Sequence, residues 1–166
     1  MAGRTLSYYL EAFGNMNRAI MRGISAPHKP LLLLAILNLV QNHYVTSHHI
    51  LLSKELVTEF KRLWLFYIGN QEGNDVIMVA EGLLMDVPKS YPFKCSIENP
   101  FYHMQHEPFW KLIRNSDAPK NGRKFYTSIK SLRLYYAYAE MDEELFELMV
   151  DVDAAGVIRQ KLEEIM

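Results

Sequence analysis

The stretch LLLLAILNLVQNHY, residues 31–44, is apolar on nearly every side and constrains the architecture more than any other part of the chain. A helix on the surface of a globular protein carries one apolar stripe, whereas a helix that is apolar all round is buried. Pro30 precedes the run, and proline suits the first turn of a helix because that turn has no intrahelical partner for an N–H group. We therefore expect a buried central helix with Pro30 in its first turn.

Amphipathic spacing predicts further helices on both sides of this run. Apolar residues recur at intervals of three and four over residues 5–21, with Thr5 as a plausible N-cap, and Ser53 caps a helix that extends to about Tyr67. Two closing helices are expected at 142–150 and 154–165. Their inward-facing side chains are expected to be Leu145, Leu148, Met149, Val157, Ile158, Leu162 and Ile165.

The segment from residue 88 to residue 114 contains four prolines, which exclude long helices there. We expect short strands and turns, with 109–113 the best strand and 132–138 a second strand or extended segment. The apolar run 76–84 fits a short helix or a strand, and its periodicity does not choose between them. The predicted fold class is mainly α with a small β element (α+β), in one domain that covers residues 1–166.

Two helices joined by a short segment, as predicted around residues 31–67, give this helical domain a helix-turn-helix-like core. That outline also occurs in helical proteins that bind no nucleic acid. Composition agrees with a globular domain, since 49% of the 166 residues are hydrophobic and 22% are charged. The longest uninterrupted apolar run, Leu31–Leu37, is too short to cross a membrane, and the first 25 residues show no secretory signal. A cytoplasmic location is expected, and the lone Cys95 is expected to be a packing residue.

Charge is distributed unevenly along the chain, although the net charge is only −1. Between residues 111 and 133 one acid, Asp117, accompanies seven cations: Lys111, Arg114, Lys120, Arg123, Lys124, Lys130 and Arg133. From residue 140 onward, acidic residues predominate. Because physiological salt confines each field to about 8 Å, the basic segment can hold a phosphate backbone despite the acidic end. The alternative is an ordinary solvated loop.

The usual signatures of metal, nucleotide and nucleophilic chemistry are missing from the sequence. His48 and His49 are adjacent and are expected to point apart, and His103 and His106 have no third ligand nearby in sequence. No HExxH, CxxC, phosphate-binding loop or GxGxxG pattern occurs, and a serine three residues before His28 is more simply a helix cap. We therefore expect no metal, no cofactor and no catalytic residue.

What remains is a recognition surface that combines aromatic and basic side chains. His28 and Lys29 lie between two prolines and are expected on a stiffened turn, and residues 102–106 are expected on another. Rings and cations interleaved in this way suit stacking or apolar contact combined with phosphate contact. Phe101, Phe109 and Trp110 are expected in the core instead.

Three motifs occur in order along nearly the whole chain: APHKPLLLL at 26–34, NPFYH at 99–103 followed by PFW at 108–110, and LR at 132–133 ahead of a DEEL helix. Together they resemble the DNA sulfur-binding domain, which accompanies an HNH nuclease in McrA-type restriction endonucleases of bacteria. The first motif is the most specific, because His-Lys-Pro ahead of four leucines is an improbable coincidence.

The resemblance implies a reader of double-stranded DNA whose backbone carries a phosphorothioate, acting in restriction or defence. Sulfur is larger, more polarisable and less well hydrated than oxygen, so an apolar pocket with a cationic rim can separate the two backbones. The pocket residues that the resemblance implies are His28, Lys29, Tyr102, His103 and His106. The histidines at 103 and 106 replace a proline and a small residue of the family, which makes the pocket more polar.

DNA backbone and base contacts are expected from the basic stretch, at Lys120, Arg123, Lys124, Lys130 and Arg133. The chain shows no counterpart of the HNH nuclease, so we expect binding without cleavage, with a nuclease partner in cis or in trans. Two alternatives stay open. One is a metal-dependent nuclease or other enzyme that uses His28, His103 and His106, and the other is a protein-interaction module that uses the acidic closing helices.

Overall fold

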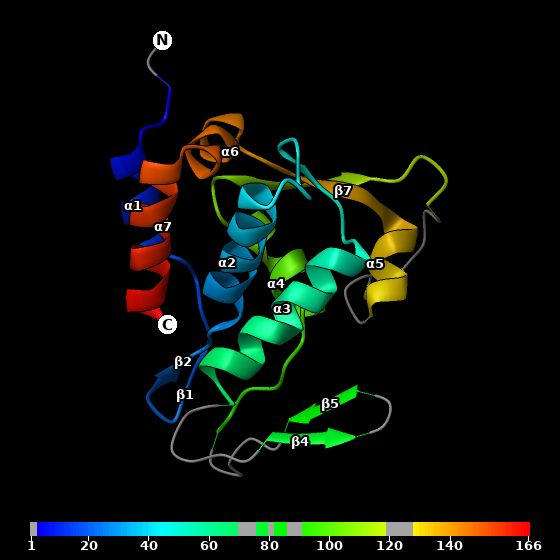
Figure 1. Ribbon diagram of the computed structural model, residues 1–166. Coiled ribbons are helices and arrows are strands. Elements are labelled where there is room, and N and C mark those ends of the chain that lie inside the picture. Colours follow the sequence, from blue (N-terminus) through cyan, green and yellow to red (C-terminus); the bar gives the residue numbers. More distant parts are fainter. Residues whose placement is uncertain (1–2, 70–75, 80–81, 86–90, 119–127) are drawn as a thin grey trace.

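A computed structural model describes residues 3–69, 76–79, 82–85, 91–118 and 128–166 (Figure 1). Its helices are α1 (Leu6–Gly14), α2 (His28–Gln41), α3 (Lys54–Tyr67), α4 (Glu98–His103), the 3-10 helix η2 (Met104–His106), α5 (Ile129–Tyr135), α6 (Glu143–Val150) and α7 (Val152–Ile165). Its strands are β1 (Ile20–Met21), β2 (Ile24–Ser25), β3 (His49–Ile50), β4 (Val76–Val79), β5 (Gly82–Met85), β6 (Trp110–Arg114) and β7 (Tyr136–Met141). The predicted class, mainly α with a small β element, is confirmed.

Helix α2 is the buried centre that the leucine-rich run predicts. Every residue from His28 to Leu37 is buried, and Pro30 lies in the first turn. Helices α3, α4, α6 and α7 all pack against α2 (Figure 1). An apolar surface on every side of a helix is stable only where neighbours cover all of it, and this arrangement provides that cover.

The pair formed by α2 and α3 matches the predicted order of elements but not a DNA-binding helix-turn-helix. Ser53 caps α3 as expected, since its Oγ accepts a hydrogen bond of 3.1 Å from the Leu56 N–H. The connection between the helices spans residues 42–53 and contains β3, whereas a DNA-binding pair has a turn of about three to four residues. Of the two helices, α2 is buried and only α3 has an exposed face.

Helix α1 starts where predicted but ends early. The Oγ of Thr5 accepts a hydrogen bond of 3.3 Å from the Tyr8 N–H, which confirms the N-cap. The expected extension to residue 21 is wrong: the helix ends at Gly14, and the chain continues into the β1–β2 hairpin. Arg22 and Gly23 form its turn with positive φ values of 54° and 77°, a conformation that glycine adopts without strain.

A three-stranded antiparallel sheet of order β3-β7-β6 joins distant parts of the chain. The strand expected at 109–113 is confirmed as β6. The expectation for 132–138 is partly wrong, because Ser128 caps α5 and the chain stays helical to Tyr135 before β7 begins. Residues 98–106 form α4 and η2 where short strands and turns were expected, and Pro100 lies in the first turn of α4.

The described residues within the apolar run 76–84 are strands, since β4 and β5 pair antiparallel. Both closing helices are confirmed, although Val157 is 42% exposed and does not face inward. Cys95 is exposed, so its predicted role in packing is wrong. Among the described residues, no helix is both long and apolar enough to cross a membrane.

Candidate functional site

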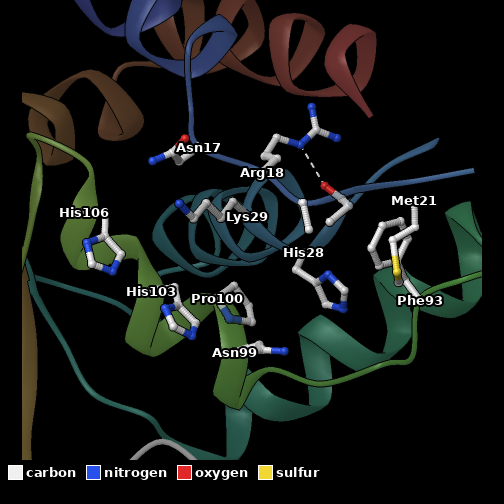
Figure 2. Close-up of a pocket in the computed structure, with 12 residues that line it drawn as sticks. Asn17, Arg18, Met21, His28, Lys29, Phe93, Asn99, Pro100, His103 and His106 are labelled. Carbon is white, nitrogen blue, oxygen red and sulfur yellow. Dashed lines mark hydrogen bonds between the residues drawn. The ribbon is translucent and has the colours of Figure 1, made fainter. Parts of the chain in front are cut away.

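A cavity of about 580 Å³ opens beside the first turn of α2 (Figure 2). The loop after α1, the β1–β2 hairpin, α4 and η2 provide its other walls. The residues that line it are Asn17, Arg18, Ala19, Met21, Ala26, His28, Lys29, Phe93, Asn99, Pro100, His103 and His106. In Figure 2, His106 lies at one end of the cavity, and Met21 and Phe93 lie at the other. The cavity thus has one end rich in nitrogen groups and one apolar end.

Four of the five predicted pocket residues line this cavity: His28, Lys29, His103 and His106. They come from two motifs that lie more than 70 residues apart in the sequence. Tyr102 does not line it. Its ring lies 6.2 Å from the ring of Tyr136, on the side of α4 that packs against α5.

Lys29 forms a buried ion pair on the cavity wall. Its Nζ lies 2.6 Å from Oε2 of Glu107, and both side chains are less than 10% exposed. The same oxygen accepts a hydrogen bond of 2.9 Å from the Asn17 N–H. The expected stiffened turn is therefore the buried first turn of α2, and Glu107 compensates the Lys29 charge. Sequence reasoning missed Glu107, because no local pattern signals a pair between residues 78 positions apart.

His28 forms part of the apolar side of the cavity. Its ring centroid lies 4.9 Å from that of Trp64 and 5.8 Å from that of Phe93. Burial lowers the pKa of His28, which keeps the imidazole neutral at pH 7. Its Nε2 lies 2.7 Å from the carbonyl oxygen of Lys94, so the tautomer that fits this contact carries its proton on Nε2 and donates it.

Arg18 brings a positive charge to the cavity that the sequence analysis did not single out. Its Nε donates to the Ala26 carbonyl and its Nη1 to the Ile165 carbonyl, both at 2.7 Å. Nη2 is buried and has no hydrogen-bond partner among the described residues, and no described carboxylate forms a salt bridge with Arg18. An uncompensated guanidinium raises the electrostatic potential around it and favours an anion nearby.

His103 and His106 lie on neighbouring turns of α4 and η2 with their rings stacked, 5.8 Å between centroids. Burial lowers the pKa of His103, and the charges of His106 and Lys29 lower it further. A pKa below the usual value leaves the His103 imidazole neutral at pH 7, so it can donate one hydrogen bond and accept another.

The predicted DNA-contacting residues are only partly described. Lys120, Arg123 and Lys124 lie outside the described residues. Lys130 is exposed on α5, and Arg133 follows on the same helix, where its Nε donates a hydrogen bond of 2.8 Å to the Leu52 carbonyl. Phe101, Phe109 and Trp110 are buried in the core, as expected.

A second cluster of polar side chains lies at the start of β3. The expectation that His48 and His49 point apart is wrong, since their ring centroids are 4.5 Å apart. Strand alternation does not separate them, because β3 begins at His49 and His48 lies in the bend before it. Glu140, the partner of His49 in the sheet register, completes the group.

No model of a known protein family matches the chain, and no curated protein matches it at a significant level. The motifs and the geometry of the cavity are therefore the observations that bear on function. The cavity has an apolar end, an end lined by the ring nitrogens of His103 and His106, and one buried ion pair.

Proposed function

We propose that this chain is a DNA-binding module that recognises a phosphorothioate in the backbone of double-stranded DNA and acts as a reader in bacterial restriction or defence. The observation that carries the proposal is the cavity of about 580 Å³, because it gathers side chains from the His-Lys-Pro motif and the Asn-Pro-Phe-Tyr-His motif around one space. These are the motifs on which the resemblance to the DNA sulfur-binding domain depends.

The two ends of the cavity suit a phosphorothioate and the unmodified phosphate next to it in the backbone. Sulfur carries a diffuse charge and loses little hydration on burial, so contact with Met21, Phe93 and Pro100 costs it less than it costs an oxygen. The neighbouring phosphate, which carries only oxygen, prefers donors, and His103 and His106 supply them at the other end.

Positive charge in this site comes from a different residue than the resemblance implies. Glu107 compensates Lys29, whereas Arg18 has no carboxylate partner among the described residues. In this proposal, Lys29 and Glu107 hold η2 against α2. Arg18 supplies the main electrostatic attraction for the DNA backbone. Lys130 and Arg133 on α5, beyond Tyr102, then contact phosphates farther along the duplex.

The apolar end can be tested with a matched pair of variants on one hairpin. Met21 lines the cavity and Ile24 does not, although the two are register partners and both are exposed. We expect the parent chain to bind a duplex with one phosphorothioate at least about tenfold more tightly than the unmodified duplex, or about 1.4 kcal/mol, at fixed salt. Met21→Ser should remove most of that preference, and Ile24→Ser should retain it.

Equal binding of the two duplexes by the parent chain would refute sulfur recognition. An equal loss of preference in both variants would mean that the hairpin acts as a whole, and it would refute the assignment of Met21 to the sulfur contact. The enzyme alternative finds less support in the geometry, because His28 is buried and its Nε2 already contacts the Lys94 carbonyl. Cleavage of plasmid DNA in the presence of a divalent metal would support that alternative.

A further inference from the structure

We infer that His48, His49 and Glu140 form a binding site for one divalent transition-metal ion, with Zn²⁺ as the expected occupant. The site lies where β3 meets β7, away from the cavity assigned to DNA, and it does not depend on the proposed function. One potential ligand atom from each of the three side chains lies within 4.8 Å of the other two.

The distances are close to those of a bound ion. Zinc bonds of about 2.0–2.1 Å in tetrahedral geometry place neighbouring ligand atoms about 3.4 Å apart. Nε2 of His49 and Oε2 of Glu140 are already 3.6 Å apart. The His49 and Glu140 side chains are about 40% exposed and that of His48 is 26% exposed, so rotation about their side-chain bonds can close the remaining gap.

The backbone holds the three residues in register before any ion binds. His49 and Glu140 are directly paired across β3 and β7, which places their side chains on one face of the sheet. The His48 carbonyl accepts a hydrogen bond of 2.8 Å from the Met141 N–H, which ties the third residue to the same strand. The ring of Tyr138 stacks on His49 at 4.3 Å and restricts its orientation.

The donor set selects the class of metal. Two imidazoles and one carboxylate suit Zn²⁺, Co²⁺ or Ni²⁺, whereas Mg²⁺ and Ca²⁺ prefer oxygen ligands alone. Three protein ligands leave a fourth position for water or another donor. Glu143 adds negative charge, since its Oε2 lies 3.6 Å from Nδ1 of His48.

One neighbouring residue opposes a cation and provides a sensitive test. Lys111 is the β6 partner of Glu140, and both line a cavity of about 310 Å³ together with His48 and Glu143. Its ammonium group repels a metal ion bound to Glu140. Removal of that charge in Lys111→Gln should therefore tighten metal binding, an effect that a damaged fold cannot produce.

The experiment is a calorimetric titration of the full chain with Zn²⁺ after treatment with a chelator, repeated with Co²⁺ while the visible absorption spectrum is recorded. We expect saturable binding of one ion per chain. Affinity should fall at least about tenfold in His49→Ala and in Glu140→Gln, and it should rise in Lys111→Gln. His43→Asn is the matched control, because it removes an exposed histidine outside the cluster, and asparagine tolerates the positive φ of 65° there.

Thermal melting without metal shows whether each variant is folded. Absence of saturable binding by the parent chain would overturn the inference. Unchanged affinity in folded His49→Ala would also overturn it, because the ion would then be held elsewhere. If the three side chains form only surface ion pairs, Lys111→Gln will leave Zn²⁺ affinity unchanged and the inference fails.

Discussion

Replacement of Glu107 with glutamine removes the negative charge that compensates Lys29 and keeps the shape of the side chain. The Lys29 Nζ is 2.6 Å from Glu107 Oε2, and both side chains are more than nine-tenths buried. A buried lysine without its partner must either stay charged in a poorly solvated place or lose its proton, and both outcomes cost free energy.

The expected loss in the free energy of unfolding is about 3–4 kcal/mol. Breaking a buried ion pair by removing one partner costs about 3–5 kcal/mol. The lower part of that range applies because the amide oxygen of glutamine can still accept the hydrogen bond from the Asn17 N–H. A domain of this kind has a total stability of about 5–15 kcal/mol, so the variant remains folded but melts at a lower temperature.

Urea denaturation followed by circular dichroism measures this loss, with Lys29→Met/Glu107→Gln as the matched control. The double variant should recover most of the stability, because neither charge is then left buried without a partner and the glutamine oxygen still accepts from the Asn17 N–H. A loss below about 1 kcal/mol in Glu107→Gln would refute the reasoning, since it would mean that water solvates the pair. A double variant less stable than Glu107→Gln would refute it as well.

Two further predictions concern the pH dependence of the free energy of unfolding and the N-cap of α3. The pKa of His28 is lowered in the folded state, so the unfolded chain binds a proton more readily than the folded chain. The free energy of unfolding should therefore fall as pH drops below about 6.5, by at most about 1.4 kcal/mol per pH unit. His28→Gln should flatten that slope in urea titrations between pH 7 and pH 5, leaving the contribution of His103, whose pKa is also lowered. A slope that His28→Gln leaves unchanged would contradict the assignment. Ser53→Ala should cost about 1 kcal/mol because the Leu56 N–H loses its acceptor, whereas Ser7→Ala, at an exposed site in α1, should cost little in the same assay.

Part of the candidate site could be predicted, because some of its residues lie in short sequence motifs. Two motifs drew attention to His28, Lys29, His103 and His106, and all four line one cavity. Their surroundings were not predictable in the same way. Lys29 was expected on a stiffened turn of a recognition surface, and its partner Glu107 lies 78 residues away, a separation at which neither spacing nor charge pattern indicates contact.

The errors in element boundaries have the same origin. Helix α1 was predicted to reach residue 21 because apolar spacing continues past Gly14, although the later side chains belong to a loop and a hairpin. The segment 132–138 was predicted as extended, whereas Ser128 starts a short helix before β7 pairs with β3 and β6. Tertiary pairing overrides local propensity in segments as short as these.

Patterns within one helical turn were enough to predict the central helix α2, the caps at Thr5 and Ser53, and the two closing helices, since burial and capping depend on neighbours three or four positions apart. Contacts across the fold brought about the Lys29–Glu107 pair, the unpartnered Nη2 of Arg18 and the meeting of His48 and His49 with Glu140. The Lys29–Glu107 and His49–Glu140 pairs join residues 78 or more positions apart, so they arise only when α2 is enclosed and β3 is paired with β7.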